Sequence, residues 1–394
     1  MRKLQNTRLA IIGTVGLPAK YGGFETLAQQ LVLQLGDDID ITVYCSGHSY
    51  PELDRPAKWK GAKLKYIPLR ANGPQSILYD FFSMLHALFF CDVLLVLGVS
   101  GCLFLPLIKM FSKKRVIVNI DGLEWLRPKW SGFGKRFLQW SEWMATRYAD
   151  EIICDNAAIQ KYVMDRYGRY SRLITYGADH VDPISARTRE ARHFPFMEKA
   201  YAFKVCRIEP ENNLHMVLEA FSQNLELPIV VVGNWDHSEF GIQLRSAYSQ
   251  YPHLHLLDPI YEPKVLNLLR SNCQLYVHGH SAGGTNPSLV EAMYLGLPII
   301  AFEVIYNRIT TQHQAAYFNN ADELAAIIQD VTPQRLEQIA LSLQRIAIKE
   351  YNWAYISDSY AKAAFGAVPA PVPSFDFELP LALRQSFQPA LKTN

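Results

Sequence analysis

A loop of small residues beside a predicted helix start is the stretch of the sequence best suited to chemistry. Residues 281–286 read Ser-Ala-Gly-Gly-Thr-Asn. Asn286 is a good helix N-cap, and Pro287 suits the first helical position because proline needs no amide partner there. The amides of Gly284, Thr285 and Asn286, together with the positive end of the helix dipole, would bind an anion such as a diphosphate.

One turn into this predicted helix, Glu291 carries a carboxylate that could accept a hydrogen bond from a sugar hydroxyl. Gly296 can close the helix in the left-handed conformation before the apolar run 297–302. A glycine-rich turn also occurs where a chain only has to reverse tightly, so a structural role stays open. The composition favours a ligand, since two glycines, a threonine and an asparagine add little to a core.

A cation lies at the end of an earlier predicted strand. Arg207 is near the end of the strand 203–208 and opens the sequence Arg-Ile-Glu-Pro-Glu-Asn-Asn. At the carboxyl edge of a sheet its guanidinium could clamp phosphate oxygens, and a surface ion pair is the alternative. His278 and His280 suggest a metal, but two ligands without a carboxylate or cysteine pattern are thin support.

The N-terminal half contains a second glycine-rich loop, residues 13–23. It is not GxGxxG, because Pro18 interrupts it, and it lacks the Gly-Lys-Ser/Thr ending of a phosphate-binding loop, so a dinucleotide cofactor is weakly supported. Gly22 and Gly23 could instead bring backbone amides near a diphosphate or an acceptor. Glu25 follows at the start of the next predicted helix, where its charge favours the helix dipole in either case.

Two carboxylates and an aromatic residue lie at the end of the buried strand predicted at 115–121. They are Asp121, Glu124 and Trp125. An aspartate at a strand end often forms only a turn. Its position at the mouth of a parallel sheet favours a catalytic or acceptor-binding role.

The next segment, residues 126–147, interleaves basic and aromatic side chains. Such a pattern is typical of a surface that lies at a membrane interface. Aromatic rings in the core with cations in water is an equally good interpretation. The residues are Arg127, Lys129, Lys135 and Arg136 among Trp130, Phe133, Phe137, Trp140 and Trp143.

Short apolar strands alternate with helices along most of the chain, which predicts an α/β fold with parallel sheets covered on both faces. At 394 residues, two domains are expected. The predicted parts are an N-terminal Rossmann-like domain at 1–180, a linker at 181–198, a C-terminal Rossmann-like domain at 199–349, a helix at 350–366 that packs back on the N-terminal domain, and a proline-rich tail at 367–394. Two doubly wound domains facing across a cleft would bind ligands at the carboxyl ends of their strands.

The composition excludes several classes of protein. The charge is nearly balanced, with 39 Lys+Arg against 37 Asp+Glu, so there is no global nucleic-acid signal. The six cysteines are scattered singly, as in a reduced cytosolic protein. Asp80 and Asp92 interrupt the most apolar region, 77–110, so we expect no membrane crossing there. The N-terminal apolar run is only a strand long, which argues against a signal peptide.

These motifs together resemble the retaining nucleotide-sugar glycosyltransferases of the GT-B fold, glycosyltransferase family four. More narrowly, the chain is similar to the bacterial rhamnosyltransferase branch of polysaccharide and O-antigen assembly. The resemblance spans residues 8–365. It is carried by the segments GTVGLPAKYGGFET, NIDGLEWLRPKW, TYGAD, RIEPENN and HGHSAGGTNPSLVEAM.

The resemblance implies a role for each matched residue. Arg207 and Glu291 would be catalytic, Arg207 on the donor diphosphate and Glu291 on a ribose or deoxyribose hydroxyl, with Asp121 orienting the acceptor hydroxyl or taking its proton. The donor-binding residues would be Gly22, Gly23, Asn212, Gly283, Gly284, Thr285 and Asn286. The acceptor-binding residues would be Tyr21, Glu25, Glu124 and Trp125.

The chain departs from the broad family pattern at three of these positions. Gly283 stands where the pattern has the first of two glutamates, and Asn212 stands where a lysine usually follows the phosphate-binding arginine. Asp121 replaces a common histidine. These departures fit the rhamnosyl branch, and they bear on the sugar-contact and base assignments.

The implied reaction is metal-independent transfer of a hexosyl group without a cofactor, with dTDP-L-rhamnose as the first donor guess. The implied acceptor is a polyprenyl-diphosphate-linked saccharide at the cytoplasmic face of the bacterial membrane, reached by peripheral contact. A GT-B sugar-nucleotide epimerase is one alternative, and a noncatalytic nucleotide-sugar or carbohydrate-binding subunit is another. An NAD oxidoreductase is the least favoured.

Overall fold

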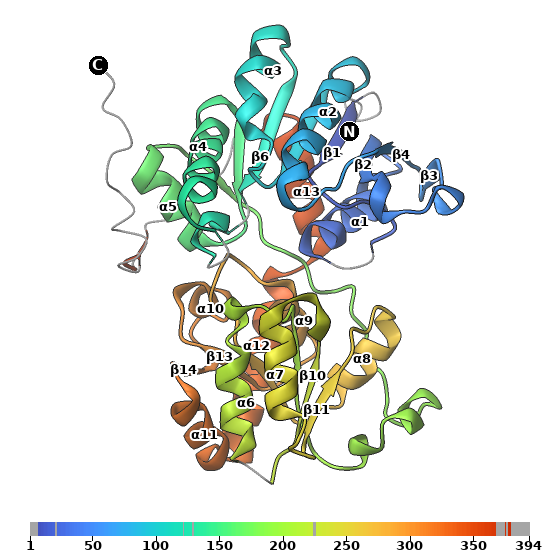
Figure 1. The fold of residues 1–394 in the computed structure, drawn as a ribbon. Helices are drawn as coiled ribbons and strands as arrows, with labels where there is room; N and C mark the ends of the chain where they lie inside the picture. Colours follow the sequence, from blue (N-terminus) through green and yellow to red (C-terminus); the bar gives the residue numbers. More distant parts are fainter. Residues whose placement is uncertain are drawn as a thin grey trace. The chain divides into compact units, whose positions relative to one another are not determined.

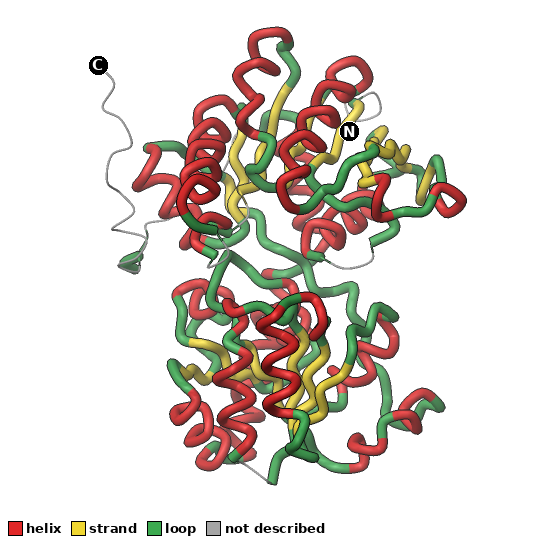
Figure 2. Tube along the Cα trace, in the orientation of Figure 1, coloured by secondary structure: helices red, strands yellow, loops and turns green. Residues whose placement is uncertain are grey.

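The computed structural model describes residues 7–19, 22–120, 122–127, 130–223, 226–367, 375 and 377–379. The chain forms two compact units, unit 1 with Met1–Thr175 and Trp353–Asn394, and unit 2 with Tyr176–Asn352. Each unit is a parallel sheet with helices packed on it (Figures 1 and 2). The predicted α/β class with two Rossmann-like domains is therefore confirmed.

The sheet of unit 1 has the strand order β3-β4-β2-β1-β5-β6-β7-β8. Neighbouring strands are parallel, apart from the antiparallel pair β3 and β4. The strands are β1 (Arg8–Ile12), β2 (Asp40–Ser46), β3 (Lys58–Trp59), β4 (Ala62–Ile67), β5 (Val93–Leu97), β6 (Arg115–Ile120), β7 (Glu151–Cys154) and β8 (Arg172–Leu173). The strands β5, β6 and β7 are short and almost wholly buried, as a sheet covered on both faces requires.

The helices of unit 1 cover both faces of this sheet (Figure 1). They are α1 (Gly23–Leu35), α2 (Ser76–Phe90), α3 (Leu105–Phe111), α4 (Gly132–Tyr148), α5 (Ala157–Tyr167) and α13 (Trp353–Ala364). The connections through α2, α3, α4 and α5 run in one direction along the sheet and the connection through α1 runs in the other, so right-handed crossovers place α1 on the opposite face. There α1 packs against α13.

The last helix of the chain is tied to unit 1 by polar contacts. Tyr360 of α13 accepts a 2.7 Å hydrogen bond from the buried amide of Asn119 on β6. Arg115, also on β6, donates to the carbonyl of Ala363 at 2.9 Å. The chain therefore returns to its first unit after completing the second.

The sheet of unit 2 has the order β11-β10-β9-β12-β13-β14 and is parallel throughout. Its strands are β9 (Ala202–Val205), β10 (Ile229–Val232), β11 (Leu254–Leu257), β12 (Leu275–His278), β13 (Ile299–Phe302) and β14 (Ala316–Phe318). Its helices are α6 (Leu214–Ser222), α7 (Glu239–Tyr248), α8 (Pro263–Ser271), α9 (Pro287–Tyr294), α10 (Ile305–Thr310), α11 (Ala321–Asp330) and α12 (Pro333–Glu350). The sequence direction reverses between β9 and β12, the point where doubly wound sheets bind ligands.

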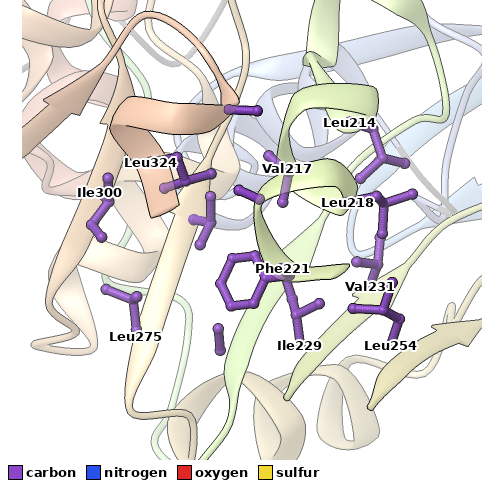
Figure 3. Close-up of a cluster of buried hydrophobic side chains, with 14 of the residues drawn as sticks. Leu214, Val217, Leu218, Phe221, Ile229, Val231, Leu254, Leu275, Ile300 and Leu324 are labelled. Carbon is purple, nitrogen blue, oxygen red and sulfur yellow. The ribbon is translucent and has the colours of Figure 1, made fainter. Parts of the chain in front are cut away.

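One apolar cluster fixes β9 and β12 beneath their loops. Phe221 of α6 is fully buried against Ile229 and Leu275, and Leu324 of α11 closes the cluster (Figure 3). Burying one such side chain contributes about 1.5–3 kcal/mol. The loops that follow β9 and β12 therefore rise from a rigid base.

Two segments differ from the sequence-based expectation. The sequence predicts a strand over residues 172–176, and the observed strand β8 ends at Leu173. The polar segment 181–198, expected as a linker, belongs to unit 2 and contains two short 3-10 helices, Glu190–His193 and Pro195–Glu198. A segment without hydrophobic periodicity can still fold into single turns, which the pattern does not detect.

Candidate functional site

The predicted helix start after the small-residue loop is present. β12 ends at His278, and α9 begins at Pro287. The Asn286 side chain accepts hydrogen bonds from the amide of Ser288 at 3.0 Å and from its hydroxyl at 2.8 Å, as an N-cap should. Gly283 has a φ of +94°, which a residue with a side chain rarely adopts. Glycine at this position is thus explained by backbone conformation.

The carboxylate of Glu291 on α9 is held by Arg270 and His180. Arg270, at the end of α8, donates from Nη1 to Oε2, and Nε2 of His180 lies 3.3 Å from Oε1. Burial by itself would raise the pKa of Glu291, but Arg270 and His180 outweigh it and lower the pKa to about 2. Glu291 is therefore ionised at neutral pH. A carboxylate has about four acceptor sites, so a sugar hydroxyl could still bind.

Arg207 lies just beyond β9, at the carboxyl edge of the sheet. Among the described residues its guanidinium takes part in no ion pair, so none of them forms the surface ion pair considered as an alternative. Its backbone is fixed, because Asn212 donates from Nδ2 to the Arg207 carbonyl at 2.9 Å. The backbone of Arg207 is thus held in place, and its guanidinium has no ion-pair partner among the described residues.

Asn212 links this loop to the loop that follows β12. Its Oδ1 lies 3.0 Å from Nδ1 of His280, so that nitrogen carries the proton. The carbonyl of His280 in turn accepts from Asn307 at 2.9 Å. Asn213, with a φ of +48°, donates from its side chain to the carbonyl of Gly279 at 2.9 Å. Asn212 therefore positions the two loops against each other.

In unit 1 the first glycine loop is held by Glu25, which is 8% exposed. Its Oε1 accepts from the hydroxyl of Thr14 at 3.0 Å and from the amide of Val15 at 2.7 Å. A Cβ added at Gly22 would lie 1.8 Å from Glu25 Oε2, and the φ of Gly22 is +132°. Gly22 therefore lets the carboxylate lie against the backbone, and Glu25 shapes the loop from inside.

Glu124 and Trp125, predicted to bind the acceptor, both make contacts within unit 1. Glu124 forms an ion pair with Arg127 at 2.8 Å and accepts from the Trp130 indole at 3.1 Å. Trp125 is 1% exposed and donates to the buried Glu142 at 3.1 Å. The Trp125 ring is therefore packed in the interior of unit 1, and its contact with an acceptor stays a prediction.

The roles assigned to the remaining site residues of unit 1 stay predictions. Tyr21 and Asp121 lie outside the described residues. Gly23 is the first residue of α1, directly after Gly22.

Three charged or titratable residues at this edge of unit 2 were missed by the sequence reasoning. They are His180, Arg270 and the buried Lys204 on β9. His180 directly follows the quoted motif TYGAD, which was a usable signal. Arg270 and Lys204 occur in amphipathic or apolar runs, where periodicity suggests only packing.

No cluster of three or more His, Cys, Asp or Glu side chains suited to a metal ion occurs in the part of the chain that the structure describes.

Two family models divide the chain between them. Residues 6–179 match a domain of unknown function, DUF1972, and residues 186–345 match the glycosyl transferases group 1 family. No curated protein sequence matches the chain.

Solved structures resemble the whole fold. Sucrose-phosphate synthase from Thermosynechococcus elongatus has a TM-score of 0.76 at 15% identity, covering 92% of this chain and 100% of its own. HepE from Anabaena in complex with UDP-glucose has a TM-score of 0.71 at 16% identity, covering 91% and 99%. The E. coli trehalose-6-phosphate structure bound with UDP-2-fluoro glucose has a TM-score of 0.66 at 10% identity, covering 92% and 100%.

The parallel sheets, the capped helix after the small-residue loop and these matches agree with one another. The chain therefore has the GT-B fold, and its residues 186–345 match the glycosyl transferases group 1 family.

Proposed function

We propose that the protein is a retaining glycosyltransferase that moves a hexosyl group from a nucleoside diphosphate sugar to a lipid-linked saccharide. The observation that carries the proposal is the arrangement at the carboxyl edge of unit 2. There Arg207, whose guanidinium has no ion-pair partner in the described chain, and the capped α9 with its ionised Glu291 share one sheet edge. The group 1 match over the same residues supports a transferase.

In the proposed reaction, groups at the carboxyl edge of the unit 2 sheet must stabilise the departing diphosphate. Negative charge builds on it as the glycosidic bond breaks, so fixed donors stabilise the transition state more than the ground state. Arg207 supplies a bidentate cation, and the amides at the start of α9 supply the helix dipole. Glu291 would accept a ribose or deoxyribose hydroxyl and orient the nucleotide. With protein groups neutralising the diphosphate, the proposed reaction uses no metal.

The acceptor hydroxyl is proposed to attack from the face that the diphosphate leaves, which retains the anomeric configuration. Asp121 is proposed to orient this hydroxyl or to take its proton. Gly22 and Gly23 would bring backbone amides near both substrates. dTDP-L-rhamnose is the proposed donor, on the strength of the resemblance to the rhamnosyl branch, and the product would belong to bacterial surface polysaccharide such as O-antigen or capsule.

Unit 1 has an apolar surface that suits a lipid-linked acceptor. Its α2 exposes Leu78, Phe82, Leu85 and Phe89 at intervals of four, three and four residues, which form one helical stripe. The same face continues over the neighbouring helices. The rings of Phe81 on α2 and Phe104 just before α3 have centroids 4.4 Å apart, and α3 contacts α4. On these helices the exposed residues are Leu107, Met110 and Phe111 of α3 and Phe133, Trp140 and Trp143 of α4.

The charges on this α2–α3–α4 surface favour an anionic membrane. Both carboxylates on the three helices, Asp80 and Glu142, are buried. Lys135, Arg136 and Arg147 of α4 are at least partly exposed. Aromatic side chains beside cations are typical of interfacial binding. Among the described residues, no helix combines the length and hydropathy that a bilayer crossing needs. We therefore propose peripheral contact with the cytoplasmic face of the bacterial membrane.

Thermal-shift titration tests the donor assignment, because a ligand that binds only the folded state raises its apparent stability. The ligands are dTDP-rhamnose, UDP-sugars, GDP-mannose and NADH. A shift with dTDP-rhamnose alone, lost in Arg207→Ala, supports the proposed donor and site. A shift with a UDP- or GDP-sugar overturns rhamnose, and a response only to NADH overturns the transferase.

Product analysis separates the alternatives. Donor consumed without any acceptor would identify an epimerase. Donor bound, but never released as nucleotide when lipid-linked acceptor is added, would identify a noncatalytic binding subunit. Transfer to acceptor with release of nucleoside diphosphate is the expected result, and it should continue in the presence of a chelator.

A further inference from the structure

A lysine is buried in the central strand of unit 2. Lys204 on β9 is 2% exposed and lies between Phe203 and Val205, both of them buried. In the described part of the chain, its ammonium takes part in no hydrogen bond and no ion pair. Lysines are almost never fully buried without a partner, because removing an ammonium from water is costly.

The end of this side chain lies at the carboxyl edge of the sheet. A Cβ added at Gly279 would lie 2.9 Å from Nζ of Lys204 and 2.3 Å from the carbonyl oxygen of Asn212. Gly279 opens the loop that leads to α9, and Asn212 belongs to the loop that carries Arg207. The ammonium therefore lies beneath the junction of the two proposed phosphate-binding loops.

The titratable groups around Lys204 do not provide an anion. Burial lowers its pKa, and the nearby Cys206 opposes this only in part. Burial raises the pKa of the Cys206 thiol, so that thiol is protonated at neutral pH. Burial, Lys204 and His280 together lower the pKa of His278, which stays neutral. Arg207, the other charged group near Cys206, is itself a cation.

Asn212 cannot supply the missing charge, although the family pattern has a lysine there. Its amide is neutral, and both ends of it are engaged, with the Arg207 carbonyl and with His280. At position 212 this chain therefore has a neutral side chain that holds two loops together, where the family pattern has a cation. A donor diphosphate carries two or more negative charges and would meet only Arg207 on this loop.

We propose that Lys204 is the second cation of the diphosphate site, reaching it from the strand below. This inference rests on the proposed function, since it takes the donor to be a nucleoside diphosphate sugar. Glycine at position 279 lets the backbone of this loop lie against both the Lys204 ammonium and the Asn212 carbonyl, since a Cβ there would press on both. Diphosphate binding would give the buried ammonium the partner that it lacks in the free protein.

The test compares binding by the purified full chain and by Lys204→Met, which removes the charge but keeps a similar length. Calorimetric titration uses inorganic diphosphate, the nucleoside diphosphates of uridine, thymidine and guanosine, and the corresponding nucleosides. We expect Lys204→Met to weaken diphosphate and nucleoside diphosphate binding about 10- to 100-fold, as loss of a charged hydrogen bond does, and to leave nucleoside binding unchanged. Lys349→Met, at a position 81% exposed on α12, is the matched control.

A second readout separates this role from a structural one. Removing an unpaired buried charge should leave thermal stability unchanged or raise it, whereas loss of a structural contact would lower it. If Lys204→Met does not fold, Lys204→Gln gives the same comparison. Unchanged diphosphate affinity in either folded variant overturns the proposal.

The outcomes also separate this proposal from the proposed function. Diphosphate binding that depends on Lys204, in a protein that transfers no sugar, would keep the site and overturn the transferase. Sugar transfer by the wild type, with unchanged diphosphate binding in the Lys204 variant, would keep the transferase and overturn the role of Lys204. A wild-type protein that binds neither inorganic diphosphate nor any nucleoside diphosphate would overturn both.

Discussion

Arg270 and Glu291 form a buried ion pair in unit 2, with side chains 3% and 13% exposed, between the end of α8 and the middle of α9. His180 approaches the same carboxylate on its other oxygen. The pair ties α9, which presents the proposed anion site, to a helix that precedes it in the chain. The orientation of the Glu291 carboxylate is therefore set by Arg270, which belongs to none of the motifs.

Replacing Arg270 with methionine should destabilise the protein by about 3–5 kcal/mol, because the Glu291 carboxylate would remain buried without its main partner. Urea unfolding measures the change. The double variant Arg270→Met/Glu291→Gln removes both charges and should recover a large part of the loss. Equal unfolding free energies for the single and the double variant would show that the pair does not hold α9.

The stability of the protein should depend on pH through Glu291. Its pKa falls from an ordinary 4.5 to about 2 in the folded state. A group with a depressed folded pKa contributes stability that is fully present above the unfolded value and is lost as pH falls through the folded value. The greater stability of the wild type over Glu291→Gln should therefore be lost as the pH falls from 4.5 to 2. Thermal melts of both proteins across this range measure the change. A difference in melting temperature that stays constant with pH would contradict the prediction.

Arg207→Ala should lower kcat/KM by about 10²–10³, which is the scale for loss of one preorganised donor to a leaving group. Its stability should barely change, since the guanidinium forms no ion pair among the described residues. Arg245→Ala is the matched control, because Arg245 pairs with Asp258 at the surface of the same unit. Initial rates with the donor found by thermal shift give the comparison. Equal losses in both variants would remove Arg207 from the site.

The structure confirmed the predictions that depend only on neighbouring residues in the chain. For the helix from Ser76 to Phe90 and the strands at 93–97 and 151–154, the sequence pattern predicts the bounds that the structure has, because each is an apolar run between clear stop signals. The Asn286 cap was predictable for the same reason. The fold class followed from the alternation of these elements.

The contacts that shape the candidate site could not be predicted, since they join residues far apart in the chain. The contacts of Glu25 with Thr14 and Val15 hold the glycine loop and were not predicted, while its role toward an acceptor stays a prediction. Trp125 read as a ligand-binding aromatic, and tertiary packing against Glu142 buries it. Lys204 occurs in a strand whose apolar neighbours gave no hint that its ammonium reaches the sheet edge.

Asp121→Asn should lower kcat by about 10²–10⁴, the range for a positioned general base, and leave donor binding intact. The substitution keeps the size of the side chain and removes its basicity. Single-turnover rates with bound donor separate this effect from substrate affinity. Full turnover in Asp121→Asn would end the assignment of this residue as base or orienting group.

The apolar surface on α2, α3 and α4 should bind anionic vesicles. Phe89 and Phe111 are 73% and 77% exposed, and replacing both with glutamine removes two of its most exposed rings at little cost to the fold. We expect the double variant to lose at least about tenfold in affinity for phosphatidylglycerol vesicles, because each ring contributes about 1.5–3 kcal/mol when fully buried. Leu341→Gln/Ile348→Gln is the control, since these residues are 47% and 59% exposed on α12 of unit 2. Vesicle co-sedimentation measures binding, and activity on a water-soluble acceptor should be unchanged in both variants. Equal sedimentation of the wild type and the Phe89/Phe111 variant would assign the surface to something other than a membrane.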